Sequence, residues 1–379
     1  MRILVLNGGS SSFKCWFHDI AEPLPIEAPR PLWEQNVSWH GEPLAEVIPA
    51  ALENLWRGPQ RVIAGPQEVQ AVGHRIVHGG RHRETMRLTP EVRAVIAEQE
   101  EFAPAHNRFE LEAIHALGGL LGANVPQFAV FDTAFHTTLD PAAYVYPGPY
   151  DWLENGIRRY GFHGISYQYA ARRAAEMLGK NDRLVICHLG NGASITAVRG
   201  GKSVDTTMGF TPLEGLMMGT RSGSLDPGIL FYLLRRGYTP DQLEGILNRE
   251  SGLKGISGLS GDMREILRAA EGDQRAQLAF EIYSHRVTRE AGAMVSVLGG
   301  MDALVFTGGV GENAAPLRER VCRQFAFLGL ELDAAKNTGS RGDADIATPQ
   351  SRVRVLVIHA QEEWEIAREC FRASTEQAD

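Results

Sequence analysis

The chain lacks the features of several protein classes. Its four cysteines are far apart and form no Cys-x-x-Cys pair, so neither a disulfide scaffold nor a zinc site is expected. No stretch approaches the roughly 18 consecutive apolar residues that a membrane span needs, and the apolar run Ile3–Leu6 is too short for the core of a signal peptide. We therefore expect a cytoplasmic protein with no membrane partner.

Positive charge is also in short supply. The 38 basic residues are outnumbered by 46 acidic ones, which gives a formal net charge of −8. Nucleic acids and anionic surfaces bind clustered positive fields, so a nucleic-acid partner is not expected. With 379 residues, of which 44% are hydrophobic, the chain is long for one domain and favours two.

Short runs rich in β-branched residues alternate with longer helical segments, which is typical of an α/β fold. The expected strands are Ile3–Leu6, Phe13–Phe17, Ala71–Val77, Gln127–Phe131, Leu184–Leu189, Ala193–Val198, Ala303–Thr307 and Val353–His359. The expected helices are Leu44–Trp56, a helix from Pro90 to about Glu100 capped by Thr89, Phe109–Leu121, Ser166–Leu178, Pro227–Arg236, Arg275–Leu298, Leu317–Phe325 and Glu363–Arg372. Asn337–Arg352 has the composition of a surface excursion.

One pattern occurs twice, about half a chain apart. Strand Ile3–Leu6 leads into Asn7–Ser12 and a second strand, and strand Leu184–Leu189 leads into Gly190–Ser194 and another strand. Glycine hairpins are common, so this repeated pattern alone is equally consistent with an internal duplication and with coincidence. Two such hairpins facing each other would offer opposed backbone N–H groups to a polyphosphate.

Three glycine-rich segments are candidate phosphate sites. In Asn7–Lys14, glycines permit close approach of an anion and a rare lysine offers charge, but the Walker spacing is absent and an ordinary hairpin is the alternative. Gly190–Gly192 is a similar, weak signal. Gly308–Asn313 reads as a glycine turn between a strand and a helix, where the helix N-terminus favours anions, yet it lacks the Gly-x-Gly-x-x-Gly spacing and a close-packing turn remains open.

Other candidates are charged residues in loops or at strand ends. Asp205–Asp226 combines acids, glycines and Arg221 in a loop-rich stretch, where sites usually lie. Asp132 directly follows an apolar strand, the usual place for a catalytic carboxylate in an open α/β sheet, although a capping role is the alternative. A metal site built from His74 and His78 is disfavoured, because no third ligand is evident.

Together these segments resemble the acetate kinase family over nearly the whole chain. The matching segments are Asn7–Lys14, Gly73–Gly80, Ala103–Asn107, Phe131–His136, Arg158–Gly164, His188–Gly192, Asp205–Asp226, Gly261–Arg264, Phe306–Asn313 and Glu362–Glu363. The resemblance implies a duplicated ribonuclease-H-like fold, of the kind found in actin-like ATPases and sugar kinases, with a nucleotide cleft between the halves, and it implies a homodimer. The first domain would comprise 1–133 and the C-terminal helix 363–379, and the second 134–362.

The resemblance also implies a role for each matched residue. Asp132, His163 and Arg221 match the catalytic residues, and Asn7 and Glu362 the Mg²⁺ ligands, with Mn²⁺ as a possible substitute. The substrate-binding residues would be Arg75, Val77, Ala105, His106, Phe162 and Pro212. The residues that bind ATP or ADP would be Lys14, His188, Leu189, Gly190, Asn191, Gly192, Asp262, Met263, Arg264, Gly309, Val310, Gly311, Glu312 and Asn313.

The chain departs from the family pattern at several positions. Ala105 stands where leucine is usual, Tyr167 where histidine is usual, Arg108 where proline is usual, and Gln361 where asparagine is usual. None of these changes removes a catalytic group, so they put acyl-chain preference in question and leave kinase activity as the expectation.

The expected activity is reversible phosphorylation of acetate by Mg-ATP, giving acetyl phosphate and ADP. Three alternatives stay open from the sequence. They are a kinase for propionate or another short-chain acid, a catalytically silent nucleotide-dependent clamp on the same fold, and, disfavoured by its spacing, a dinucleotide oxidoreductase at Gly309–Asn313.

Overall fold

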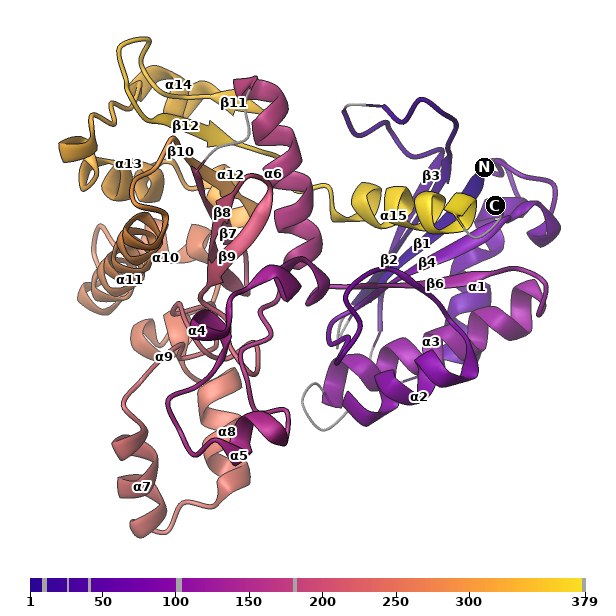
Figure 1. Ribbon diagram of the computed structural model, residues 1–379, viewed down its shortest axis with the longest axis horizontal. Helices are drawn as coiled ribbons and strands as arrows, with labels where there is room; N and C mark the ends of the chain where they lie inside the picture. The colour runs from indigo at the N-terminus through magenta and orange to yellow at the C-terminus, as the bar shows by residue number, and fades with distance from the viewer. Residues whose placement is uncertain (9–11, 26, 40–41, 100–103, 180–182, 377–379) are drawn as a thin grey trace. The chain divides into compact units, whose positions relative to one another are not determined.

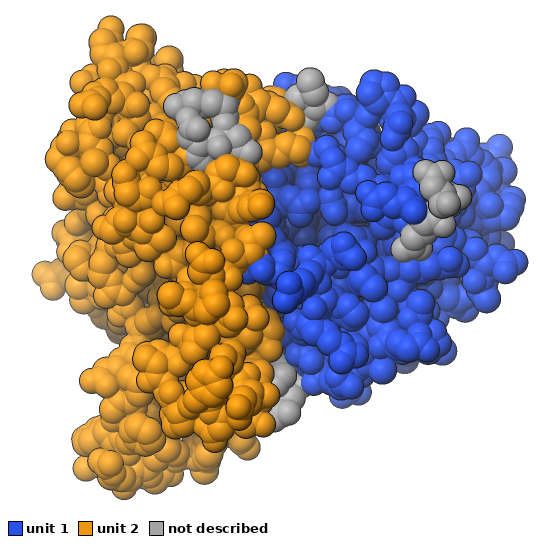
Figure 2. Space-filling view, viewed as in Figure 1, with its two compact units in different colours: residues 1–137, 164–169, 361–379 blue, residues 138–163, 170–360 orange. Residues whose placement is uncertain are grey.

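The computed structural model describes residues 1–8, 12–25, 27–39, 42–99, 104–179 and 183–376, without the side chains of 104–106. The chain forms two compact units (Figure 2). Unit 1 comprises Met1–Thr137, Gly164–Tyr169 and Gln361–Asp379, and unit 2 comprises Thr138–His163 and Ala170–Ala360. These limits differ from the expected domain boundaries mainly in grouping Gly164–Tyr169 with unit 1.

Unit 1 is built on a six-stranded mixed sheet with the order β3-β2-β1-β4-β6-β5. Its strands are β1 (Arg2–Gly8), β2 (Ser12–Asp19), β3 (Trp33–Ser38), β4 (Ala71–Ile76), β5 (Met86–Arg87) and β6 (Gln127–Phe131). The first three strands form an antiparallel meander, β1, β4 and β6 are parallel, and β5 pairs antiparallel with β6. The carboxyl ends of the three parallel strands therefore share one edge.

Helices cover both faces of this sheet (Figure 1). They are α1 (Leu44–Trp56), α2 (Pro90–Glu98), α3 (Pro104–Leu121) and α15 (Glu362–Glu376). Leu4, Leu6 and Val72 pack with α1 and α3 in one apolar core. On the other face, a side chain at Gly73 would start 2.9 Å from Ile366 of α15, so glycine allows close approach of this helix.

Unit 2 repeats the same topology with a second six-stranded sheet, in the order β11-β12-β10-β7-β8-β9. Its strands are β7 (Arg183–Leu189), β8 (Ala193–Arg199), β9 (Lys202–Thr206), β10 (Ala303–Thr307), β11 (Ala344–Asp345) and β12 (Arg354–Val357). Here β7, β8 and β9 form the antiparallel meander, β7, β10 and β12 are parallel, and β11 pairs antiparallel with β12. Strand for strand, the two sheets correspond, which confirms the duplication.

The helices of unit 2 are more numerous and include several that the sequence did not predict. They are α4 (Pro141–Tyr144), α5 (Asp151–Glu154), the C-terminal part of α6 (Gly164–Leu178), α7 (Pro227–Arg235), α8 (Pro240–Arg249), α9 (Gly252–Ser257), α10 (Met263–Ala269), α11 (Gln274–Leu298), α12 (Gly308–Asn313), α13 (Ala315–Arg323) and α14 (Ala334–Gly339). The long helix α11 packs on β7, β8 and β9.

One expectation for unit 2 was wrong, and another was incomplete. Gly308–Asn313 is the short helix α12 itself, not a glycine turn before a helix, because only Gly308 adopts a left-handed backbone, with φ of 78°. The stretch Asn337–Arg352 contains the end of α14 and strand β11, and the Asn337 amide oxygen accepts a hydrogen bond of 2.8 Å from the buried guanidinium of Arg318. Its polar composition therefore serves an internal contact as well as the surface.

Candidate active site

In unit 1, the predicted site residues gather at the carboxyl edge of the sheet. Asn7 lies near the end of β1, Arg75 is the penultimate residue of β4, and Asp132 directly follows β6. Glu362 is the first residue of α15. The parallel course of three strands brings together residues that are up to 355 positions apart in the chain.

Arg75 is the centre of this group. Its Nη2 and Nε atoms donate to Asp132 Oδ2 at 2.5 and 3.0 Å, and its Nη1 donates to Asn7 Oδ1 at 3.2 Å. Asn7 Nδ2 in turn donates to Glu362 Oε2 at 3.4 Å. Burial acts to lower the pKa of Arg75, but the charges of Asp132, Glu362 and Glu110 outweigh it and raise that pKa. Arg75 is therefore a fixed, permanently charged cation.

Glu110 is a buried carboxyl group that the sequence did not single out. Both of its carboxyl oxygens accept from the backbone N–H of Val77, at 3.1 and 3.3 Å. Burial raises the pKa of Glu110 to about 8, although the nearby charge of Arg75 opposes the rise. The sequence carries no signal for this role, because it does not distinguish Glu110 from Glu112, which lies two residues later on α3 and is exposed.

In unit 2, the predicted phosphoryl-binding residues also come together. His163 has a left-handed backbone with φ of 59°, and its Nδ1 lies 2.9 Å from Ser194 Oγ. The rings of His163 and His188 have centroids 4.3 Å apart. A Cβ atom at Gly192 would lie 3.4 Å from His163 Nε2 and 3.6 Å from Arg221 Nη1, so both nitrogens converge on this glycine.

Backbone contacts join the predicted nucleotide-binding segments around the end of β7. The N–H of Gly219 donates to Asn191 O at 3.0 Å, and a Cβ at Gly261 would be 2.9 Å from Gly219 O. At Gly308, a Cβ would lie 2.8 Å from Leu189 O. At Gly261 and Gly308 the backbone is thus packed too closely for a side chain, as glycine permits.

Several predicted nucleotide residues carry local contacts of their own. Asp262 caps α10 by accepting from Arg264 N at 2.8 Å and also pairs with the Arg264 guanidinium. Glu312 accepts from the N–H of Ala360 at 3.0 Å and contacts His359. Lys14 is exposed, with Nζ 5.6 Å from the Trp16 ring centroid. Their nucleotide roles stay predictions.

The predicted acyl-pocket residues are divided between the units. Val77 belongs to unit 1, and Phe162 and Pro212 belong to unit 2; Val77 and Phe162 are buried. The side chains of Ala105 and His106 lie outside the described part of the structure. Tyr167, which stands where the family usually has histidine, is fully buried in unit 1 and packs against the rings of Phe135 and His136.

The side-chain oxygens of Asn7 and Glu362 are ligands of the kind that magnesium prefers. Mg²⁺ prefers hard oxygen ligands, keeps several waters and is commonly held by only one or two carboxylates together with substrate phosphates. One amide oxygen and one carboxylate match that pattern. Among the described residues no group of three or more His, Cys, Asp or Glu side chains could hold a metal ion, and no described helix is long and apolar enough to cross a membrane.

A separate cavity of about 320 Å³ opens at the other edge of the unit 1 sheet. It is lined by Arg87, Leu88, Arg93, His115, Gly118, Gly119, Gly122, Ala123, Val125, Pro126 and Gln127. Gln127 begins the strand that Asp132 follows, so the whole length of β6 separates this cavity from the candidate site.

Comparison with known proteins covers the chain from end to end. The family model described as the acetokinase family matches residues 2–368. An acetate kinase of Gloeobacter violaceus is 55% identical over 401 aligned positions, covering 98% of this chain and 99% of its own. An acetate kinase of Acaryochloris marina is 53% identical over 395 positions, covering 98% and 99%.

Solved structures agree with the fold. The crystal structure of Porphyromonas gingivalis acetate kinase has a TM-score of 0.89 at 38% identity, covering 98% of this chain and 99% of its own. A propionate kinase from Francisella tularensis has a TM-score of 0.88 at 36% identity, with the same coverage. At full length, both acetate and propionate kinases therefore share this fold.

Proposed function

Because the chain belongs to the acetokinase family, we propose that it phosphorylates acetate with ATP, reversibly giving acetyl phosphate and ADP. The observation that carries the proposal is the convergence of His163 Nε2 and Arg221 Nη1 beside Gly192. Two donors directed at one point suit the oxygens of a phosphoryl group in transfer. A carboxylate oxygen of acetate attacks the γ-phosphorus, the bond from that phosphorus to the β,γ-bridging oxygen breaks, and ADP leaves.

The protein's main task in this reaction is to position groups and neutralise charge. The carboxyl group of acetate is ionised at neutral pH, since carboxylic acids of this kind have a pKa of about 4–5, so no general base is required. Arg75 binds the acetate carboxylate, and His163 and Arg221 stabilise the charge on the equatorial phosphoryl oxygens. In the reverse direction the same groups bind acetyl phosphate.

Asp132 acts by orienting Arg75. Its Oδ2 receives two N–H groups of the Arg75 guanidinium, which fixes the plane of the cation. Such charge-assisted contacts are shorter and stronger than neutral hydrogen bonds. This arrangement supports a role in placing the arginine, and no proton transfer by Asp132 is needed.

Magnesium would be held by Asn7 and Glu362, with Mn²⁺ as a substitute. When bound beside the ATP phosphates, the ion neutralises negative charge on the β- and γ-phosphoryl oxygens. Asn7 also accepts from Arg75 Nη1, so the residue that binds the ion and the residue that binds acetate are directly linked.

The test is trapping of the acyl phosphate with hydroxylamine. Acetate, Mg-ATP and hydroxylamine should give acetohydroxamate in proportion to enzyme, and the Arg221→Ala variant should give far less. A silent clamp or a dinucleotide oxidoreductase would give no hydroxamate with any acid. Loss of product on omitting Mg²⁺ and its return with Mn²⁺ would test the metal.

Propionate is the second candidate substrate. Ala105 is smaller than the leucine that is usual at this position in the acetokinase family. The Francisella tularensis propionate kinase shares the fold. Parallel hydroxamate assays with acetate and propionate at equal concentration measure the preference. A higher kcat/KM for propionate would make the chain a propionate kinase of the same family.

A homodimer in the cytoplasm completes the proposal. Helix α7 has no buried residue, and it exposes Ile229, Phe231, Tyr232 and Leu234 to solvent. Apolar side chains left exposed around a whole helix are typical of a surface that pairs with another copy. Light scattering should give twice the chain mass, and Phe231→Asp with Tyr232→Asp should give a monomer, whereas Leu278→Asp on α11 should stay dimeric.

A further inference from the structure

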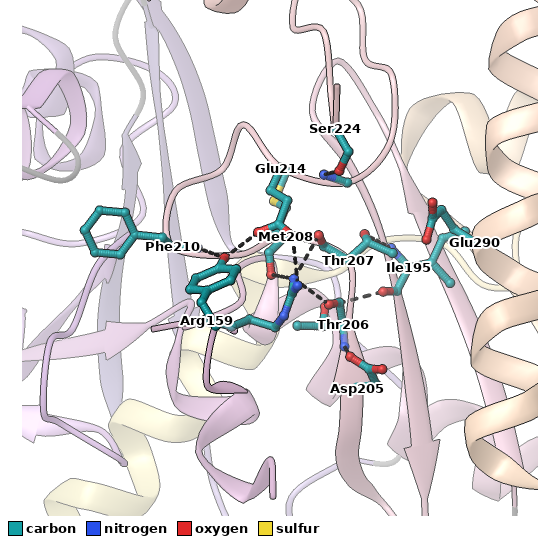
Figure 3. A network of polar contacts seen from close by, with 12 residues as sticks. Arg159, Ile195, Asp205, Thr206, Thr207, Met208, Phe210, Glu214, Ser224 and Glu290 are labelled. Carbon is teal, nitrogen blue, oxygen red and sulfur yellow. Dashed lines mark hydrogen bonds and ion pairs between the residues drawn. The ribbon is translucent and has the colours of Figure 1, made fainter. Parts of the chain in front are cut away.

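Arg159 lies at the centre of a polar network in unit 2 (Figure 3). Its Nη1 atom donates to the carbonyl oxygens of Thr206, Thr207 and Met208 at 3.0, 3.1 and 3.0 Å. Its Nη2 atom donates to Glu214 Oε1 at 2.8 Å. One guanidinium therefore fixes the end of β9, the start of the following loop, and a carboxylate further along that loop.

Tyr146 and Glu214 close the network from the other side. The Tyr146 hydroxyl donates to Glu214 Oε2 and accepts from the N–H of Phe210 at 2.8 Å. Gly209 sits against this pair, because a Cβ there would lie 1.7 Å from Glu214 Oε2 and 2.0 Å from the Tyr146 oxygen. Residues 207–215, which we call the clamp loop, are thus held at several successive backbone positions.

The clamp loop connects the network to the candidate site. Arg221 Nη1 donates to the carbonyl oxygen of Pro212, at 3.2 Å, in the middle of the loop. The Gly209 carbonyl accepts from Tyr160 and Gly161 N–H at 3.0 and 3.3 Å, just before His163. The loop that Arg159 holds therefore contacts both the guanidinium of Arg221 and the segment that carries His163.

We infer that Arg159 is a positioning residue, which orients Arg221 for phosphoryl transfer through the clamp loop and the Pro212 carbonyl. The inference rests on the proposed function of Arg221. Without Arg159, three carbonyl oxygens and one carboxylate lose a donor, and the loop relaxes toward water. The Pro212 oxygen then no longer fixes the Arg221 fork relative to His163.

The inference makes a specific kinetic prediction for Arg159→Gln. Small displacements of a positioned group reduce the rate of the chemical step by up to about a hundredfold, so kcat should fall by about tenfold to a hundredfold. The KM for ATP should change by less than about threefold, because Arg221 acts in the transition state. Arg159→Lys should recover little of the loss, since a point charge cannot contact three carbonyls and a carboxylate.

A double-mutant cycle separates positioning from a general loss of stability. In the Arg221→Ala background, Arg159→Gln should lower kcat by less than about threefold, because the group it positions is already gone. An equal loss in both backgrounds, or a near-normal kcat in Arg159→Gln alone, would overturn the inference. If Arg221→Ala alone keeps normal turnover, the role proposed for Arg221 fails instead.

Arg183→Gln is the matched control. Arg183 also makes several side-chain contacts in unit 2, to Asp302 at 2.8 and 3.1 Å and to Gly299 O at 2.8 Å, but it lies at the start of β7, away from the clamp loop. Its loss should lower Tm as Arg159→Gln does and leave kcat unchanged. If Arg159→Gln does not fold, Tyr146→Phe, which removes only the hydroxyl contacts, replaces it in the same cycle and should show the same non-additivity with Arg221→Ala.

Discussion

The same sheet occurs twice in this chain, and its two copies use their strand ends differently. At the carboxyl ends of β1, β4 and β6, unit 1 places polar and charged side chains, Asn7, Arg75 and Asp132. At the corresponding ends of β7 and β10, unit 2 has Gly190 and Gly308, each beside other backbone. Unit 2 takes its charged groups from loops instead, since His163 and Arg221 lie outside its sheet.

The difference is consistent with the two tasks that the proposed function assigns to the two copies of the sheet. Side chains at strand ends reach a small ion or carboxylate, whereas glycines let an extended polyphosphate approach backbone N–H groups. Loops vary without disturbing a sheet, and the segment 207–226 follows β9 while β9 stays paired with β8 and β10 with β7.

The largest effect is expected where each unit contributes an arginine. Arg75→Ala and Arg221→Ala should each lower kcat by roughly a hundredfold or more, which corresponds to about 3 kcal/mol of lost charge stabilisation. Arg221→Lys should also be poor, because an ammonium cannot replace a two-pronged guanidinium. Steady-state kinetics on the three variants measure these changes in kcat. Near-normal turnover in either alanine variant would contradict the role proposed for that arginine.

An effect on the choice of acid, with turnover of acetate retained, is expected at the acyl end of the substrate. Ala105→Leu should lower the propionate-to-acetate ratio of kcat/KM by about tenfold to two-hundredfold, because one methylene in an apolar pocket is worth about 1–3 kcal/mol. Tyr167 is buried against the rings of Phe135 and His136, so its ring already packs within unit 1. A ratio that stays constant or rises would mean that unit 1 does not set acyl specificity.

Most of the scaffold was predictable because its signals are local. Thr89, Pro90 and Glu91 predicted the start of α2, where Thr89 Oγ1 accepts from Val92 N–H, and the apolar runs predicted both sets of central strands. Motif matching also named residues that the fold does bring together, such as Arg75 with Asp132 and His163 with Arg221.

What the sequence did not reveal depends on long-range contacts. Arg159 meets carbonyls 47 to 49 positions away, and Glu110 meets Val77 across 33 positions, with no short-range pattern to mark either. Strand β9 was not predicted because Lys202–Thr206 has no apolar run. Such features follow only once the register of β8 against β9 and the packing of α3 are known.

A moderate loss of stability is expected from a side chain at Gly308. This residue has φ of 78°, where an L-residue costs about 1–2 kcal/mol, and its Cβ would meet Leu189 O at 2.8 Å. Gly308→Ala should therefore lower Tm and raise the KM for ATP. Gly309→Ala is the control, because its Cβ meets nothing within 4 Å, and its Tm should hold or rise. Equal Tm values for the two variants would mean that the close approach of Gly308 to the Leu189 carbonyl does not require glycine at this position.

The smallest effect on turnover, and the clearest dependence on pH, is expected at Glu110 in unit 1. Burial raises its pKa to about 8, with Asp132 adding to the rise and Arg75 opposing it, whereas glutamate in an unfolded chain titrates near 4.3. The protonated carboxyl group therefore contributes its full stabilisation below about pH 4, and that contribution is lost as pH rises through about 8. Glu110→Gln keeps an oxygen acceptor for the Val77 N–H and cannot ionise.

The variant should consequently gain Tm relative to wild type between pH 5 and pH 9, with most of the gain complete once the pH exceeds the raised pKa of about 8. Glu112→Gln, which removes an exposed carboxylate from the same helix, should follow the wild-type curve throughout. Thermal unfolding of all three proteins across this range measures the difference. If the wild-type and Glu110→Gln curves run parallel, Glu110 is not the source of the stability lost as pH rises, and Glu363 on α15, whose pKa burial raises to about 7, is the next group to test.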